Sequence, residues 1–374
     1  MNFLFACGGT AGHINPALAI AKELCRRIPD TKILFVGADN TMEKELVPKA
    51  GYELVNIRMS GLKRGFYPGD LVYNAKTIRN LALAGRKTAD IIKGFAPDAV
   101  IGTGGYICYP VLRKAAHMGI PTIIHESNAV PGLTTKLLST IVDKVLVSFP
   151  GLENTYRRPE RVVFTGTPVR GGFGVESAGE RLGDYDRKPL ILSFWGSLGA
   201  SRMNETIIEF MKLNISRGEF RHIHAAGRFC DAKEMKSRLI SPGANVDLPP
   251  GIEIRDYIDN IQAVMTEADV VISRAGGSTV AELTAMGKPA VLIPSPYVSN
   301  NEQEKNAQQL SLAGGAVVLE EKNCTGELLF ETVSGILLDS DRLNSMSAAQ
   351  RAIGKPRATE EIAELILSQI ISNK

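Results

Sequence analysis

Short apolar runs recur along this chain, and amphipathic segments separate them. We expect strands in these runs, near residues 32–37, 97–105, 121–127, 144–149, 189–195, 269–277 and 289–296. Runs without polar alternation are typical of parallel strands, because the helices that connect parallel strands cover both faces of the sheet. The pattern therefore predicts the α/β class.

The opening strand and turn have a counterpart in the second half of the chain. "LFACGGTAGHINPALAI" and "LILSFWGSLGASRMNETI" both read as a strand, a glycine-bearing turn and the beginning of a helix. A length of 374 residues also favours two domains over one. We predict two doubly wound domains, residues 1–167 and 168–344, joined through the glycine-rich stretch 162–174.

Composition and charge exclude several classes of protein. The net charge of +3 is too small for a typical nucleic-acid binder, so no nucleic-acid partner is expected. The five cysteines show no CxxC spacing, which argues against a zinc site or a disulfide framework and favours a reducing cytoplasm. The first residues do not read as a secretory signal, and no apolar run reaches about 18 residues, so we expect any membrane contact to be peripheral.

A glycine-rich turn follows the first expected strand. Gly8, Gly9 and Gly12 belong to it, and Pro16 is expected at the first helical position, where a missing N–H is tolerated. Backbone N–H groups at the start of a helix form a site for phosphate or for developing negative charge. The turn does not match GxGxxG, which disfavours a dinucleotide-dependent oxidoreductase.

His13 lies just past this turn. Because the positive end of the helix dipole disfavours imidazolium, we expect a ring that is neutral near pH 7 and able to accept a proton. Its spacing is equally compatible with a cap of the helix.

The second half of the chain repeats the arrangement in "SRAGGSTVAELTAMGKPAVLIPSP". Gly276 and Gly277 turn the chain there, and Ser278 or Thr279 is a candidate cap. Glu282, one turn into the helix, is positioned to accept both hydroxyls of a ribose, although a solvated helix face is the plainer interpretation. The amides of residues 299–310 follow a strand end and suit sugar hydroxyls, or form a surface loop.

Seven blocks, in order from residue 8 to about 316, carry a resemblance to a known family. They read "GGTAGHINPALAIAKEL", "GTGGY", "IHESNAVPGLTTKLLS", "GTPVR", "WGSLGA", "SRAGGSTVAELTAMGKPAVLIP" and "NEQEKNAQQL". Together they resemble the MurG family of bacterial glycosyltransferases. The resemblance implies a GT-B fold of two Rossmann-like domains facing a cleft, with a final helix, about 345–374, crossing back to the first domain.

The resemblance also implies an activity and a set of substrate contacts. The enzyme would move N-acetylglucosamine from UDP-N-acetylglucosamine to the C4 hydroxyl of lipid I, the undecaprenyl-diphosphate-linked muramyl-peptide, giving lipid II for peptidoglycan. The implied binding residues are Thr10, Ala11, Gly12 and Asn128 near the donor, Arg170 and Ser197 at the diphosphate, Ile258 at the uracil, Gly277, Ser278, Thr279, Val280, Ala281 and Glu282 at the phosphates and ribose, and Gln303 at the sugar.

Transfer with inversion needs a base for the acceptor hydroxyl and neutralisation of the departing diphosphate. His13 is our first candidate for the base and Glu126 the second. The helix start near Gly277, together with Arg170, offsets phosphate charge, so neither a metal nor another cofactor is expected. The chain departs from the family pattern at Ala11 and Trp195, where glycines are usual.

The lipid-linked acceptor implies a peripheral enzyme on the cytoplasmic face of the cell membrane. Segment 58–93 mixes apolar residues with Lys76, Arg79 and Arg86, a composition that suits an anionic membrane surface. An ordinary amphipathic helix packed on the sheet is the alternative for this segment. For the whole chain, the alternatives are a glycolipid synthase, a UDP-N-acetylglucosamine 2-epimerase and a non-catalytic nucleotide-sugar sensor.

Overall fold

The computed structural model describes residues 1–39, 41–59, 84–169, 188–196, 199–240 and 247–372. The chain divides into two compact units. Unit 1 comprises Met1–Gly171 and Arg357–Lys374, and unit 2 comprises Gly172–Pro356. Unit 2 is therefore inserted into the sequence of unit 1. The boundary predicted from the sequence was residues 167 and 168.

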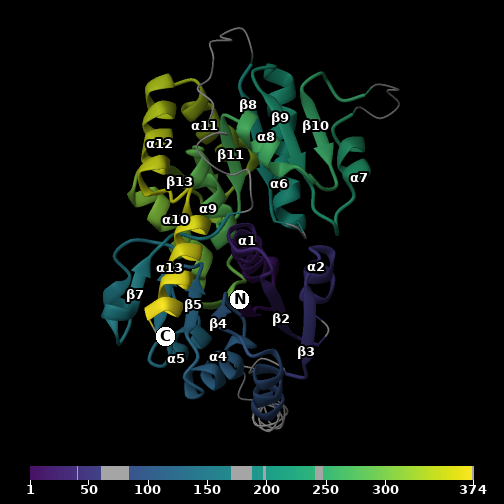
Figure 1. The fold of residues 1–374 in the computed structure, drawn as a ribbon. Helices are drawn as coiled ribbons and strands as arrows, with labels where there is room; N and C mark the ends of the chain where they lie inside the picture. The colour runs from purple at the N-terminus through teal and green to yellow at the C-terminus, as the bar shows by residue number, and fades with distance from the viewer. Residues whose placement is uncertain (40, 60–83, 170–187, 197–198, 241–246, 373–374) are drawn as a thin grey trace, which may run out of the picture. The chain divides into compact units, whose positions relative to one another are not determined.

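Unit 1 is built on a seven-stranded sheet in which every paired strand is parallel (Figure 1). Its order is β3-β2-β1-β4-β5-β6-β7. The strands are β1 (Asn2–Ala6), β2 (Lys32–Ala38), β3 (Glu53–Ile57), β4 (Ala99–Gly102), β5 (Thr122–Glu126), β6 (Lys144–Val147) and β7 (Val162–Phe164). Strand β7 lies inside the stretch expected to be a linker, so that expectation was wrong for residues 162–164.

Helices accompany this sheet. They are α1 (Ala11–Arg27), α2 (Glu43–Lys49), residues 84–95, α4 (Cys108–His117), α5 (Leu133–Leu138) and α13 (Ala358–Ser372). Helix α13, yellow in Figure 1, packs against α1 and buries Ile362 and Ile366 in the same core as Phe3 and Phe5. Burial of each of these side chains contributes about 1.5 to 3 kcal/mol before entropy is counted. The last helix thus completes the core of the first unit.

Helix α1 begins earlier than the sequence suggested. Its first residue is Ala11 and its N-cap is Thr10, whereas Pro16 lies inside the helix. The amides of His13 and Ile14 already donate to the Thr10 carbonyl, at 3.0 and 3.2 Å. His13 therefore belongs to the first helical turn and faces back toward the glycine turn.

Unit 2 holds a six-stranded parallel sheet in the order β10-β9-β8-β11-β12-β13. The strands are β8 (Leu190–Phe194), β9 (Arg221–Ala225), β10 (Ile252–Arg255), β11 (Val270–Ser273), β12 (Ala290–Leu292) and β13 (Ala316–Val318). The α-helices are α6 (Ser201–Arg217), α7 (Ala232–Ser237), α8 (Ile261–Glu267), α9 (Gly277–Met286), α10 (Glu302–Leu312), α11 (Gly326–Leu337) and α12 (Ser340–Ile353).

The C-terminal segment forms two helices. Helix α12 packs against α9 in unit 2, whereas α13 belongs to unit 1. Gly354, just after α12, lies so close to α9 that a Cβ on it would stand 2.4 Å from the Thr284 carbonyl oxygen. A glycine is required at this contact because backbone, which cannot move aside, occupies the space a side chain would need.

Both sheets reverse their strand order at one point. The reversal lies between β1 and β4 in unit 1 and between β8 and β11 in unit 2. In open α/β sheets, ligands bind outside the carboxyl ends of the strands at such a point. Each unit therefore offers one expected ligand position. Within the described part of the chain, no helix is long and apolar enough to span a membrane.

Candidate active site

The loops after β1 and β4 meet at the reversal point of unit 1. Gly9, Gly104 and Gly105 have φ values of +91°, +118° and +89°, a left-handed region that favours glycine. A Cβ on Gly105 would lie 2.5 Å from the Gly8 carbonyl oxygen. Glycine at position 105 therefore lets the loop after β4 approach the backbone of the turn after β1 closely.

His13 is oriented by this turn. Its Nδ1 lies 3.0 Å from the Gly8 carbonyl oxygen and 3.4 Å from the Thr10 hydroxyl. A carbonyl oxygen only accepts hydrogen bonds, so Nδ1 carries the proton. In the neutral ring, Nε2 then holds the lone pair. The space beside that edge exists because residue 104 is glycine, since a Cβ there would lie 2.8 Å from Nε2.

Glu126, the second candidate base, is engaged by its own loop. One carboxylate oxygen accepts from the backbone and side-chain amides of Asn128, both at 3.2 Å, and the other accepts from the Gly132 amide at 3.0 Å and the Thr135 hydroxyl at 2.7 Å. These bonds hold Asn128 in place. The neighbouring His125 is fully buried, and burial lowers the pKa of its imidazole from 6.5 to about 4.

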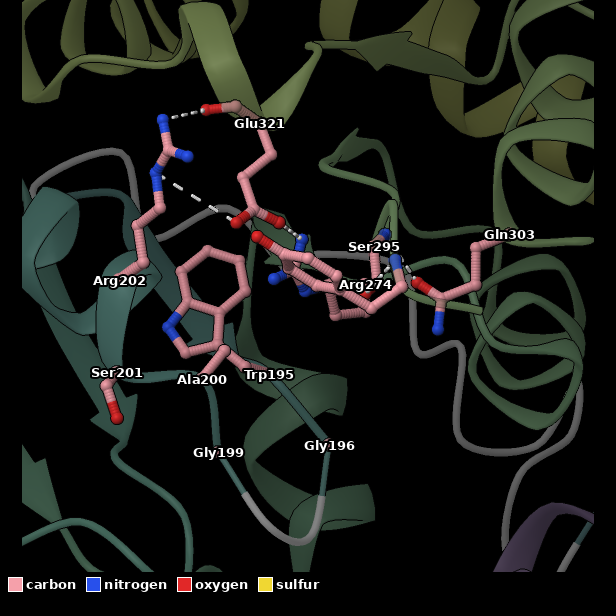
Figure 2. Close-up of a pocket in the computed structure, with 11 residues that line it drawn as sticks. Trp195, Gly196, Gly199, Ala200, Ser201, Arg202, Arg274, Ser295, Gln303 and Glu321 are labelled. Carbon is pink, nitrogen blue, oxygen red and sulfur yellow. Dashed lines mark hydrogen bonds and ion pairs between the residues drawn. The ribbon is translucent and has the colours of Figure 1, made fainter. Parts of the chain in front are cut away.

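Unit 2 contains a cavity of about 480 Å³ at its reversal point. Loops after β8, β11, β12 and β13 line it, and Figure 2 shows their side chains converging on it. Gln303, at the start of α10, lines the cavity, and its Oε1 accepts a hydrogen bond of 2.9 Å from the Ser295 amide. This bond fixes the side-chain amide and leaves its NH₂ group as a pair of donors.

Arg274 is the most enclosed cation of this cavity. Its Nη1 lies 2.7 Å from Oε2 of Glu321 and donates to the Ile293 carbonyl oxygen at 3.0 Å. The guanidinium carbon lies 5.9 Å from the centre of the Trp195 ring, and Arg202 lies 4.0 Å from the other oxygen of Glu321 (Figure 2). Both of these contacts with oxygen atoms use Nη1, which is one of the three nitrogens that together carry the five N–H donors of a guanidinium. The arrangement holds a cation at the wall of a polar cavity.

Helix α9 begins beside the second glycine turn. Its N-cap is Gly276, which supplies no side-chain hydrogen bond to the first helical amides. The Ser278 hydroxyl oxygen is buried and has no hydrogen-bond partner among the described residues. Glu282 is buried in the same helix, whose first turns also hold Thr279, Val280 and Ala281. Backbone N–H groups and a hydroxyl at the start of a helix are hydrogen-bond donors suited to binding an anion.

The predicted site residues fall into separate groups in the structure. Thr10, Ala11, Gly12 and His13 lie at the glycine turn of unit 1, and Glu126 with Asn128 follows β5 in the same unit. The residues from Gly277 to Glu282 share the first turns of α9. Gln303 lines the cavity, and Ile258 is buried after β10. Arg170, Ser197 and most of segment 58–93 lie outside the described residues.

Two residues that line the cavity, Arg274 and Glu321, were not predicted from the sequence. Arg274 stands directly after an expected strand and before the glycine turn, so its position was a usable signal. Glu321 follows β13 and gave no signal, because its pairing with Arg274 arises only when β11 and β13 share one sheet.

Comparison with known proteins matches each unit to a domain of a known family. Residues 3–147 match the model of the glycosyltransferase family 28 N-terminal domain, and residues 190–365 match that of the family 28 C-terminal domain. The chain is 43% identical over 377 residues to the UDP-N-acetylglucosamine–N-acetylmuramyl-(pentapeptide) pyrophosphoryl-undecaprenol N-acetylglucosamine transferase of Acetivibrio thermocellus, covering 100% of this chain and 99% of the relative. The enzyme of the same name from Thermoanaerobacter sp. is 42% identical, with 98% and 100% covered.

Solved structures agree with this assignment. MurG of Acinetobacter baumannii superposes with a TM-score of 0.77 at 25% identity, covering 98% of this chain and 99% of that chain. A UDP-N-acetylglucosamine 2-epimerase from Neisseria meningitidis has a TM-score of 0.65 at 14% identity, covering 98% of this chain and 100% of that one, and shares the fold alone. With both family 28 models matched in order and relatives of about 40% identity over the whole length, the chain belongs to glycosyltransferase family 28.

Proposed function

We propose that this chain transfers N-acetylglucosamine from UDP-N-acetylglucosamine to the C4 hydroxyl of lipid I, with inversion at the anomeric carbon. The observation that carries the proposal is the 43% identity, over the full length of both chains, to a transferase named for that reaction. Lipid II would be the product.

We assign the acceptor proton to His13. Its Nδ1–H is bound to the Gly8 carbonyl, so Nε2 is the nitrogen able to receive a proton from the C4 hydroxyl. Both oxygens of Glu126 already accept hydrogen bonds in their own loop, which favours a positioning role for that carboxylate. Asn128, held by Glu126, is assigned to the donor sugar.

The diphosphate leaving group needs positive charge and hydrogen-bond donors that are in place before the reaction. We assign this role to Arg274, to the first amides of α9 and to the buried Ser278 hydroxyl, together with Arg170 and Ser197. Glu282 would accept the ribose hydroxyls, Ile258 would contact the uracil and Gln303 the sugar hydroxyls. Arg274 pre-paired with Glu321 costs little reorganisation when the diphosphate departs.

The acceptor is anchored in a lipid bilayer, so we propose a peripheral enzyme at the cytoplasmic face. Of the basic residues in segment 58–93, Arg86 lies in the described helix 84–95, where the neighbouring Lys87 donates to the Asn56 carbonyl. Positive charge at a membrane-facing segment attracts anionic lipid headgroups. Lipid I and an anionic surface are thus the proposed partners.

The test uses labelled UDP-N-acetylglucosamine and a short-chain lipid I analogue, with and without EDTA. Transfer of label to the lipid in both samples is expected, because side-chain cations and backbone amides supply the neutralising charge. Consumption of the donor without an acceptor would favour a UDP-N-acetylglucosamine 2-epimerase instead. Transfer to diacylglycerol would favour a glycolipid synthase, and donor binding without turnover a sensor.

A further inference from the structure

A buried carboxylate lies beneath the glycine turn of unit 1. Glu43, the first residue of α2, has no exposed surface. Its Oε2 accepts a hydrogen bond of 3.2 Å from the Gly9 amide, and its Oε1 accepts one of 2.9 Å from the Ala38 amide. Both oxygens therefore bind backbone, one in the turn after β1 and the other at the end of β2.

The backbone around Glu43 is built to admit it. A Cβ on Gly8 would lie 2.6 Å from Oε1, and a Cβ on Gly37 would lie 2.5 Å from Cγ of Glu43. Two glycines thus make the space that the side chain fills. A charged group is costly to bury without hydrogen bonds, so the carboxylate and the turn hold one another in a single geometry.

The same turn sets the state of His13. Glu43 binds the amide of Gly9, and the carbonyl of the adjacent Gly8 accepts from Nδ1 of His13. The Gly8–Gly9 peptide therefore connects the buried carboxylate to the imidazole. A rotation of that peptide would remove the acceptor that keeps the proton on Nδ1.

We infer that Glu43 is a positioning residue, which holds the Gly8 carbonyl in place so that His13 keeps its proton on Nδ1 and presents an unprotonated Nε2. The catalytic consequence rests on the proposed function, in which Nε2 receives the acceptor proton. The tautomer itself does not depend on any activity. Glu43 touches neither substrate in this scheme and acts only through the turn.

The decisive variant is Glu43→Gln, which keeps the size of the side chain but replaces one accepting oxygen by an NH₂ group. Gly9 and Ala38 both present N–H donors, so one of them would then face another donor. Glu45→Gln, on the exposed side of the same helix, is the matched control. Glu43→Asp keeps the charge but draws the carboxylate back, and serves as a second variant.

The first measurement is the nitrogen-15 spectrum of the histidine rings, with His13 identified by its absence in His13→Ala. The chain has five histidines, so selective labelling suffices. We expect a protonated Nδ1 and an unprotonated Nε2 in the wild type and in Glu45→Gln, and a mixture of tautomers in Glu43→Gln. A wild-type ring protonated on Nε2 would overturn the inference, as would an unchanged tautomer in folded Glu43→Gln.

The second measurement separates binding from turnover. Glu43→Gln should lower kcat by roughly 10-fold to 100-fold, the usual effect of a misplaced catalytic group, with donor affinity unchanged. A loss of donor affinity at constant kcat would contradict a role at His13. If both Glu43 variants fail to fold, protection of the Gly9 amide from hydrogen exchange in the wild type decides, because rapid exchange there overturns the inference. An inactive wild type with the expected tautomer would refute the proposed function and not this assignment.

Discussion

Two buried histidines should make unit 2 sensitive to mild acid. Asn204 determines which nitrogen of each ring carries the proton. Its Nδ2 donates to the Ala226 carbonyl, so its Oδ1 must accept from Nε2 of His224. His224 Nδ1 therefore accepts from the Ser193 hydroxyl, and that oxygen accepts from Nε2 of His222, each at 2.7 Å. Nδ1 of His222 is left without a proton, and it has no partner among the described residues.

Adding a second proton to either ring in the folded unit would cost free energy. Burial lowers the pKa of His224 from 6.5 to about 3, and burial with the neighbouring His224 lowers that of His222 well below 6.5. The unfolded chain binds a proton at each ring as the pH falls below about 6.5, whereas the folded unit does not. The free energy of unfolding therefore decreases with falling pH, by about 1.4 kcal/mol per pH unit for each ring. At pH 5 the loss is about 2 kcal/mol per histidine, or about 4 kcal/mol for the pair.

Urea unfolding followed by tryptophan fluorescence tests this value. Trp195 is the only tryptophan of the chain, lies in unit 2 and is 4% exposed, so its emission reports the unfolding of that unit. Between pH 7 and pH 5 the wild type should lose about 4 kcal/mol, and His222→Leu only about 2 kcal/mol. The comparison uses the change with pH and not the absolute stability, which the variant also alters. Equal losses in the two proteins would refute the proton assignment.

Three further predictions concern the proposed reaction. His13→Ala should lower turnover by roughly 10² to 10⁴-fold with donor affinity nearly unchanged. Kinetics and equilibrium donor binding test this, and a loss of donor affinity at nearly unchanged turnover would mean that His13 only holds the substrate. Glu282→Ala should raise the KM for the donor by an amount equivalent to about 1.5 to 3 kcal/mol; an unchanged KM would make Glu282 structural. Replacing Lys76, Arg79 and Arg86 by Ser should weaken sedimentation with anionic liposomes but spare turnover of a water-soluble acceptor, and unaltered sedimentation would place membrane contact elsewhere.

The strands that the sequence predicted are those with continuous apolar runs. Runs such as residues 32–37 and 189–195 became central strands because both faces of each are covered. Strand β9 was missed because "RHIHA" reads as polar. Its two histidines are buried with hydrogen bonds to the Ser193 hydroxyl on the neighbouring strand and, for His224, to Asn204 of α6. Strand β10 lies at a sheet edge and alternates buried with exposed residues over four positions, too few for a clear pattern.

The candidate site was predictable where its residues are adjacent in sequence. Gly8 and Gly9 directly after an apolar strand indicated the glycine turn, and the short distance in sequence from these glycines indicated His13. The orientation of the imidazole was not predictable, since it depends on Gly104 from another loop and on the carboxylate of Glu43 below the turn. Contacts between distant segments arise from the order of the strands, which local patterns do not encode.

The return of α13 to unit 1 has a consequence for biosynthesis. A chain emerging from the ribosome completes all of unit 2 before residues 357–374 appear, so unit 2 has every segment it needs while unit 1 still lacks its last helix. Until then, the core positions that Ile362 and Ile366 will cover on the first unit remain open. The glycine turn that orients His13 is thus among the first parts synthesised, in a unit that is completed last.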